Sequence, residues 1–158
     1  MKSAAKYLIL TLVALLTASC SRFFDDLSKC VTPKLLFVYY ADGTNNVLKD
    51  HIQSGRLYVY DESGKLHYSL PLGAAELRDG MELKDIHSGK WTLVAWGNIN
   101  SATDVEAPES ISEGAVTALP DKAGIFPTSV SLYYAEYELD FSKMEGKDVE
   151  VPFSLAHV

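Results

Sequence analysis

Runs of apolar and alternating residues mark a series of short strands along the chain. Residues 34–41 (KLLFVYYA) are apolar, aromatic and β-branched without a helical period, which predicts a strand buried on both faces. Residues 56–60 and 65–70 alternate on either side of the turn 61–64 (DESG), whose Asp and Gly are typical of a short hairpin connection. This part of the chain therefore predicts one strand followed by a β-hairpin.

A second pair of strands is predicted at residues 81–86 and 90–98, around a short turn at 87–89. Successive side chains of a strand point to opposite faces, so whichever face of 90–98 is inward brings one tryptophan to the core. The tyrosines of the preceding hairpin and a phenylalanine of the first strand also fit core positions. The predicted core residues are Trp91, Trp96, Tyr58, Tyr60 and Phe37.

The remaining segments complete an all-β pattern. Residues 46–53 are the only candidate for a short helix, of one or two turns. Residues 97–127 are rich in Gly, Pro, Asn, Ser and acids, so we expect a functional or mobile loop with at most one strand, near 115–119. Residues 129–139 and 148–158 return to a strand pattern. Pro152 cannot donate to a ladder, so the last strand is predicted to lie at a sheet edge or contain a bulge.

About seven short strands without βαβ alternation predict a two-sheet antiparallel β-sandwich over residues 33–158. The chain stops at Val158 within a strand-like alternation. We therefore expect a truncated sandwich that lacks its last strand.

The N-terminal residues have the plan of a signal peptide, predicted at residues 1–19. Lys2 and Lys6 precede an apolar run at 7–16 that is shorter than the roughly 20 residues that a spanning helix needs. The following residues, LTASC, resemble the lipobox of bacterial lipoproteins and end at Cys20. We expect lipidation of Cys20 and an extended tether over 20–32. The alternative is an ordinary secretory peptide cut after Ala18 or Ser19, which would leave Cys20 a plain thiol.

Charge and cysteine content narrow the classes of partner. The formal net charge is −7, and loss of the two signal-peptide lysines makes it more negative, which argues against binding of nucleic acid. Beyond Cys20 the chain has one cysteine, Cys30, so no internal disulfide is expected, and this thiol is either free or paired between chains. The four histidines lack zinc-ligand spacing, and we expect neither a metal nor a cofactor.

Signatures of catalysis are missing from the sequence. It contains no GxSxG, HExxH, GxxxxGK[ST] or GxGxxG motif, and no enzymatic activity is expected. The carboxylate pairs at 25–26, 61–62 and 136/138 are interpreted as solvated charge. The oxygen-rich segment 42–46 (DGTNN) lacks the ligand order of an EF-hand and is interpreted as a turn. The tyrosine-rich stretches could stack on sugars, but packing is the favoured interpretation.

Four segments together resemble a known family: CSRFFDDLSKC (20–30), LLFVYY (35–40), RLYVYDESG (56–64) and WTLVAWGN (91–98). They are similar to the fimbrial anchor lipoproteins of the Bacteroidales, the FimB-like or fimbrillin-A-associated anchor family. The resemblance implies a transthyretin-like β-sandwich at the base of a fimbria, surface-exposed and lipid-anchored in the outer membrane. Its partners would be major or minor fimbrillins. Members usually carry a second sandwich, which this chain does not reach.

Two functions are compatible with these observations. The leading one is an anchor that limits or terminates a fimbria by pairing an exposed sheet edge with a strand of a neighbouring subunit. The alternative is a surface glycan-binding or adhesive lipoprotein that uses the 97–127 loop and the tyrosines. An accessible groove between the sheets would favour the first function, and exposed aromatic side chains beside that loop would favour the second.

Overall fold

The computed structural model describes most of the predicted sandwich. Its described residues are 33–99, 103–106, 108–120, 122–125, 131–144 and 146–156. The predicted signal peptide (1–19), the lipidation site Cys20, the tether (20–32) and Cys30 lie outside the described residues.

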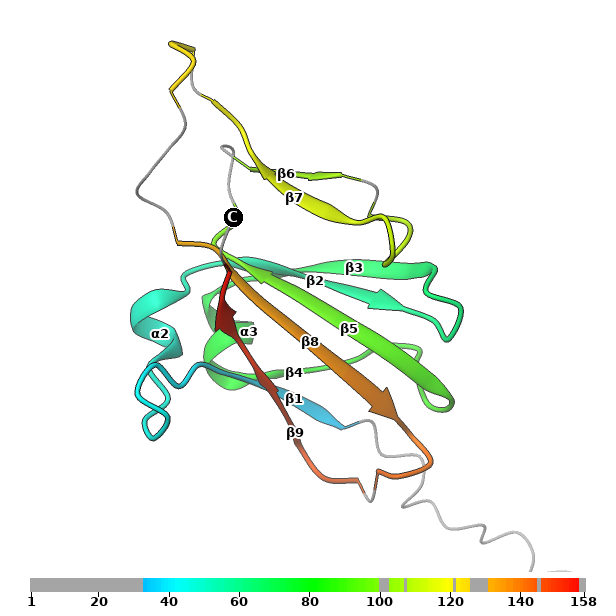
Figure 1. Ribbon diagram of the computed structural model, residues 1–158. Coiled ribbons are helices and arrows are strands. Elements are labelled where there is room, and N and C mark those ends of the chain that lie inside the picture. The colour runs from blue at the N-terminus through cyan, green and yellow to red at the C-terminus, as the bar shows by residue number, and fades with distance from the viewer. Residues whose placement is uncertain are drawn as a thin grey trace, which may run out of the picture. The chain divides into compact units, whose positions relative to one another are not determined.

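Two sheets pack face to face and form the sandwich (Figure 1). The small sheet has the order β4-β1-β9, with β1 at Lys34–Val38, β4 at Met81–Glu82 and β9 at Val149–Pro152. The large sheet has the order β10-β8-β5-β2-β3. Its strands are β2 (Gly55–Tyr60), β3 (Leu66–Leu72), β5 (Lys90–Gly97), β8 (Tyr133–Asp140) and β10 (Ser154–Leu155).

The predicted all-β sandwich is confirmed, and every pair within the large sheet is antiparallel. One pair of the small sheet differs, because β1 and β9 are parallel, with Leu35 opposite Val149 and Phe37 opposite Val151. More than a hundred residues separate these two strands, so no hairpin imposes their direction. The connection after β8 turns the chain back, and this return sets the direction of β9.

The hydrophobic core lies between the two sheets. Leu35 and Val151 of the small sheet and Leu57 and Leu93 of the large sheet have no exposed surface. Phe37 is also buried there and packs against Phe153, with ring centroids 6.1 Å apart. Alternation within the strands therefore places one face of each sheet in the core. Strand β1 differs from the prediction for 34–41: it ends at Val38, and Leu36 on its other face is only partly buried.

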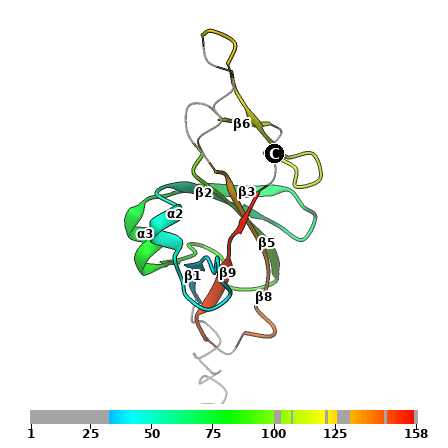
Figure 2. The same cartoon turned by 60° about the vertical axis from the view of Figure 1, so that its left-hand side comes forward.

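Two short helices lie side by side next to the sheets (Figure 2). Helix α2 (Leu48–His51) confirms the predicted helical turn and buries Leu48. Helix α3 (Ala74–Asp79) was not predicted. The Glu76 carboxylate accepts the Gly73 N–H at 3.0 Å, which stabilises the start of this helix. No helix within the described ranges is both long and apolar enough to cross a bilayer.

The predicted pairing of residues 81–86 with 90–98 is wrong. Strand β4 pairs with β1 in the small sheet, whereas β5 lies between β2 and β8 in the large one. Leu83 and Ile86, which connect β4 to β5, are each at least 98% buried. Because these two side chains are buried, the connection passes from one sheet to the other through the core. Strands β4 and β5 therefore belong to different sheets.

The last predicted strand, 148–158, is divided between the two sheets. Strand β9 belongs to the small sheet, and β10 joins the edge of the large sheet, with Ser154 opposite Tyr134. The chain changes sheets directly after Pro152. The edge position predicted from this proline is confirmed, since β9 is an outer strand of the small sheet.

Residues 97–127 contain two strands, where the sequence pattern predicts at most one. Strands β6 (Thr103–Glu106) and β7 (Ala115–Ala118) form a hairpin in which Val105 is opposite Val116. Val105 and Ile111 pack against aromatic side chains of the large sheet. A hairpin that covers an existing surface needs only a few apolar side chains. The segment therefore has the polar composition that is typical of loops.

Candidate functional site

Strand β8 has an edge that is only partly covered. Strand β10 pairs with the beginning of β8, where Leu155 lies opposite Tyr133 and Ser154 opposite Tyr134. No described strand pairs with the same side of β8 from Glu136 to Asp140. This stretch, called here the open edge of β8, is continuous with the position that β10 occupies.

The hydrogen bonds at both ends of β8 show which backbone groups lie on the open edge. Ala156 donates its N–H to the carbonyl of Leu132 at 2.9 Å, and Phe141 donates its N–H to the carbonyl of Gly89 at 3.1 Å. Backbone groups of successive residues point to opposite sides of a strand, so even-numbered residues of β8 face β10 and odd-numbered ones face β5. The N–H and C=O groups of Glu136 and Glu138 therefore point toward the open edge.

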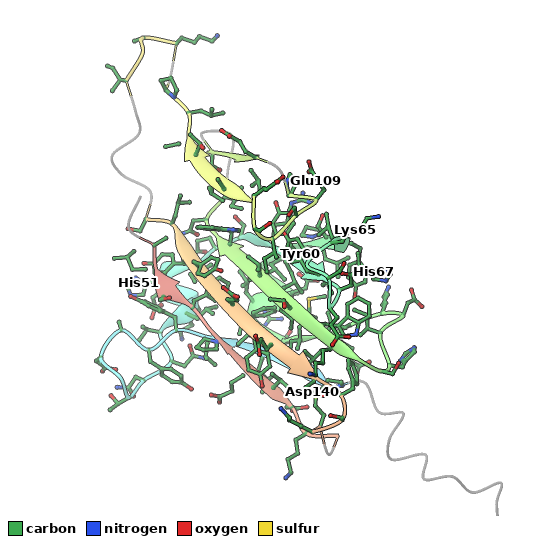
Figure 3. All side chains as sticks on the ribbon, turned by 45° about the vertical axis from the view of Figure 1, so that its right-hand side comes forward. His51, Tyr60, Lys65, His67, Glu109 and Asp140 are labelled. Atoms are coloured by element: carbon green, nitrogen blue, oxygen red, sulfur yellow. The ribbon has the colours of Figure 1, made fainter. Side chains whose placement is uncertain are left out.

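A groove of about 710 Å³ runs along this edge, beside β9. We call it the seam groove, because it follows the line where the two sheets separate. Figure 1 shows β8 and β9 next to each other, and Figure 3 shows Asp140 at the end of β8. The groove is lined by Glu62, Lys90, Trp91, Thr92, Tyr137, Glu138, Leu139, Asp140, Lys143, Met144, Lys147, Asp148, Val149 and Glu150.

The seam groove combines charged residues with an apolar part that adjoins the core. Leu139 and Val149 belong to the buried core, and Trp91, Tyr137 and Met144 pack against that core while keeping part of their surface exposed. An apolar side chain that entered the groove would therefore contact the sandwich core directly. Removal of such surface from water is favourable by about 25 cal/mol per Å².

Asp140 shapes the end of the groove by closing the turn after β8. One carboxylate oxygen accepts the Ser142 hydroxyl at 2.6 Å and the Ser142 N–H at 3.0 Å, and the other lies 3.3 Å from the Lys143 ammonium. The Ser142 hydroxyl, with smaller contributions that include Lys143, holds the pKa of Asp140 below its usual value. This carboxylate remains charged in neutral water and fixes the turn that leads to β9.

The opposite edge of the large sheet is protected from pairing. Ser69 and Pro71 of β3 lie opposite Tyr58 and Arg56 of β2. Because backbone groups alternate along a strand, the backbone groups of Ser69 and Pro71 point away from β2, toward the outer edge. Pro71 has no N–H to offer there. At the start of β3, Leu66 donates its N–H to the carbonyl of Glu109 at 2.9 Å. The seam groove is therefore the better acceptor for a further strand.

A second candidate site, the aromatic cluster, lies on the outer face of the large sheet. Tyr58 and Tyr60 are only 5% and 4% exposed, and the Trp96 and Tyr134 rings lie 4.8 Å apart. The β6–β7 hairpin and residues 108–114 cover these rings and leave a cavity of about 60 Å³. Burial raises the pKa of both Tyr58 and Tyr60. Their faces are not available for stacking on a sugar in this arrangement.

The five predicted core residues occupy three kinds of environment. Phe37 is buried between the sheets, whereas Tyr58 and Tyr60 are buried on the outer face, under the hairpin. Neither tryptophan is fully buried: Trp91 packs against the main core and Trp96 against the aromatic cluster. The Trp91 indole N–H donates to the Ser88 carbonyl at 2.7 Å, which keeps its polar end at the surface.

The remaining polar candidates are turns. Asp42 accepts the N–H groups of Thr44 and Asn45, each at 2.9 Å, so the predicted turn at 42–46 is confirmed and this carboxylate is occupied by backbone donors. Asp61 accepts the N–H groups of Ser63 and Lys65 at 2.9 and 3.1 Å in the β2–β3 turn. In the part of the chain that the structure describes, no three His, Cys, Asp or Glu side chains converge as a metal site would require.

Sequence reasoning interpreted Glu136 and Glu138 only as exterior charge. Both side chains are exposed, but their backbone groups form the open edge of β8. The alternation YYAEYEL predicts a strand and its outer face. It carries no signal for which side of the strand stays unpaired, because that depends on where β10 ends.

Comparison with known proteins agrees with this architecture. The family model of the fimbrillin-A associated anchor proteins Mfa1 and Mfa2 matches residues 27–157. The fimbrial anchor protein Mfa2 from Porphyromonas gingivalis has a similar fold, with a TM-score of 0.55 and 16% identity, over 78% of this chain and 49% of that one. Its similarity to this chain confirms the sandwich fold.

Two Bacteroides structures share the fold. A candidate adhesin from Bacteroides ovatus has a TM-score of 0.67 and 18% identity, over 78% of this chain and 46% of that one. Candidate polysaccharide-binding proteins from Bacteroides thetaiotaomicron have a TM-score of 0.66 and 15% identity, over 78% of this chain and 47% of that one. The chain thus spans about half the length of these structures. No curated protein matches the sequence significantly.

Proposed function

We propose, from the premise that this chain belongs to the family of fimbrillin-A associated anchor proteins, that it binds an extended strand of a fimbrial subunit in the seam groove. Membership of this family gives the chain a fimbria-associated or adhesive role, in a class not known for enzymatic activity. Strand binding at the groove would anchor or terminate a fimbria at the cell surface. The open edge of β8 is the observation that supports this proposal.

Strand addition needs two physical elements, and the seam groove has both. Main-chain groups at a free sheet edge provide affinity, and pockets for alternate side chains provide register. Glu136 and Glu138 supply the backbone groups. Trp91, Tyr137 and Met144 supply an apolar surface on the core side. A bound strand would also satisfy the backbone groups of an edge that is otherwise a site of aggregation.

Attachment to the outer membrane is the second part of the proposal. We assign it to acyl chains on Cys20, with residues 20–32 as a tether between the membrane and the sandwich. Two or more acyl chains anchor a protein stably, whereas one chain binds only marginally. The fibre would then grow away from a membrane-held base, with a major or minor fimbrillin as the first bound subunit.

The alternative, a glycan-binding or adhesive lipoprotein, has weaker support. Fold likeness to candidate polysaccharide-binding proteins exists at 15% identity, and a shared fold does not carry a shared ligand. The aromatic cluster that would stack on sugars is covered by the β6–β7 hairpin. Binding at that face would first require displacement of the hairpin.

A proline at the open edge tests the proposal without breaking the ladder inside the sheet. The N–H of residue 138 points away from β5, so Glu138→Pro removes a donor for an added strand and leaves the β5–β8 ladder intact. The matched control is Ser69→Pro, which removes an outward N–H at the other edge of the same sheet. Both variants should melt within a few degrees of the unchanged protein.

Capture of fimbrial subunits is the measurement. A photoreactive amino acid at position 138 of the protein on fimbriated cells should cross-link to a fimbrial subunit, identified by mass spectrometry, and the same group at position 69 should not. Glu138→Pro should lower the amount of cell-attached fimbriae, and Ser69→Pro should leave it unchanged. Equal cross-linking at both positions, or full attachment by a folded Glu138→Pro variant, would refute the strand-acceptor function.

A further inference from the structure

The outer rim of the open edge carries the negative charges of Glu136 and Glu138. Glu136 and Glu138 project from the outer face of β8 and are exposed. On the neighbouring strand β5 they lie directly opposite Val94 and Thr92, which carry no charge, and Lys90 lies diagonal to Glu138, opposite Asp140. Among the described residues, neither glutamate forms an ion pair within 4.0 Å, whereas Lys143 pairs with Asp140 at 3.3 Å. Glu136 accepts a hydrogen bond from the Tyr134 hydroxyl, which is uncharged.

The inner rim of the same edge is apolar. Tyr137 and Leu139 alternate with the two glutamates and face the core, together with Trp91. A strand that pairs with β8 places its own side chains directly opposite these residues and on the same face. The open edge therefore offers two different surfaces to alternate positions of one incoming strand.

The orientation of that strand follows from β10. Strand β10 pairs antiparallel with β8, and the open edge continues the same ladder position. An incoming strand that continues this hydrogen-bond pattern would form its bonds with the outward N–H and C=O groups of Glu136 and Glu138. The residues opposite these two would then have their side chains on the acidic outer face.

We propose that the seam groove selects a strand that runs antiparallel to β8 and alternates large apolar residues with lysine or arginine. The basic residues would lie opposite Glu136 and Glu138, and the apolar residues would contact Tyr137, Leu139 and Trp91. This inference rests on the strand-acceptor function proposed above and adds the chemistry of the partner. Cross-strand pairs of opposite charge stabilise a ladder and like charges destabilise it, so the rim would also reject acidic strands.

Three peptides separate charge from alternation. The first is KVKLKVK with a fluorescent label, the second is its acidic counterpart EVELEVE, and the third, KKVLVKK, has the composition of the first without alternation. Binding to the full chain in detergent micelles is measured by fluorescence anisotropy at about 150 mM salt, where long-range attraction to a negative protein is screened. We expect KVKLKVK to bind roughly tenfold or more tightly than either other peptide. In EVELEVE the two side chains opposite Glu136 and Glu138 carry like charge, and in KKVLVKK the lysines no longer alternate with the apolar residues.

Charge reversal on the protein should exchange this preference. The variant E136K/E138K should bind EVELEVE more tightly than KVKLKVK. The matched control D50K/E113K makes the same change in net charge at exposed residues away from the groove and should keep the original preference. Hydrogen exchange supplies the location, since bound KVKLKVK should protect the amides of Glu136 and Glu138.

The outcomes distinguish the inference from the function on which it rests. If KVKLKVK and EVELEVE bind equally well at this edge and KKVLVKK binds poorly, strand acceptance stands and charge selection is refuted. If KKVLVKK binds as tightly as KVKLKVK, or D50K/E113K loses the preference as E136K/E138K does, the attraction is non-specific and the inference is wrong. If no peptide protects Glu136 and Glu138, both the inference and the strand-acceptor function are refuted.

Discussion

The Tyr60 hydroxyl donates a hydrogen bond of 3.0 Å to the carbonyl oxygen of Pro108, which joins the end of strand β2 to the segment that covers the large sheet. Tyr60 and Glu109 lie close together in Figure 3. The Tyr60 ring is 4% exposed, and its burial raises the pKa of the hydroxyl. This contact, together with the packing of Val105 and Ile111, holds the β6–β7 hairpin over the aromatic cluster.

Removal of this hydroxyl should loosen the hairpin and leave the sandwich folded. Tyr60→Phe loses one hydrogen bond, so the free energy of unfolding should fall by about 0.5–1.5 kcal/mol. Amides of β6 and β7 should exchange faster, while those of β5 and β8 change little. Tyr40→Phe is the control, because that hydroxyl is more exposed and its contact with Glu150 is long, at 3.5 Å. Unchanged exchange in β6 and β7 would mean that the hydrogen bond does not hold the hairpin.

The centre of the core should be far more sensitive to truncation than the surface. Leu93 lies on the middle strand of the large sheet and has no exposed surface. Leu93→Ala should lower the free energy of unfolding by about 2–5 kcal/mol, since it removes buried atoms and leaves a cavity. Leu119→Ala is the control at a side chain 38% exposed, with an expected change of about 0.5 kcal/mol or less. Comparable denaturation midpoints for the two variants would contradict the assignment of the core.

The Asp42 turn should weaken in acid. Hydrogen bonds from the Asn45 and Thr44 backbone lower the pKa of Asp42 well below its ordinary value of 3.8. The native state thus holds this proton less tightly than the unfolded state, so the stabilisation is complete above about pH 4 and is lost as the pH falls through the lowered pKa. Asp42→Ala should therefore be less stable than the unchanged protein at pH 7, and the difference should shrink below about pH 3.

Chemical denaturation across this pH range measures the difference. Asp42→Asn is the control, because its side-chain oxygen still accepts the two N–H groups but has no charge to lose. If the difference in free energy of unfolding between Asp42→Ala and the unchanged protein stays constant from pH 7 to about pH 2.5, the carboxylate charge contributes nothing to stability.

Membrane attachment should depend on Cys20. If acyl chains on this residue are the anchor, Cys20→Ala should yield unprocessed or soluble protein. Extraction of membranes with carbonate, followed by detection of the protein in pellet and supernatant, measures the distribution. Cys30→Ala is the matched control and should stay with the membrane. Retention of Cys20→Ala in the pellet would rule out lipid anchoring at this residue.

The sequence by itself determined where most strands of the large sheet lie and how their side chains alternate between two faces. Alternation in 56–60, 65–70 and 90–98 encodes these features locally, because side chains of a strand point to opposite faces with a period of two. The turn at 61–64 and the edge position of Pro152 were also readable, since each depends on the chemistry of one or two residues. Resemblance in four short segments identified the family.

Only the tertiary structure decided how the strands are paired and which edge stays open. Burial of Leu83 and Ile86 separates β4 from β5, and the change of sheet after Pro152 ends the cover of β8 at Tyr134. Neither event leaves a local pattern, because pairing partners are set by the packing of segments far apart in the chain. The seam groove exists for the same reason: Glu136 and Glu138 lie on a strand that the sequence predicts, at an edge that only the arrangement of its neighbours leaves free.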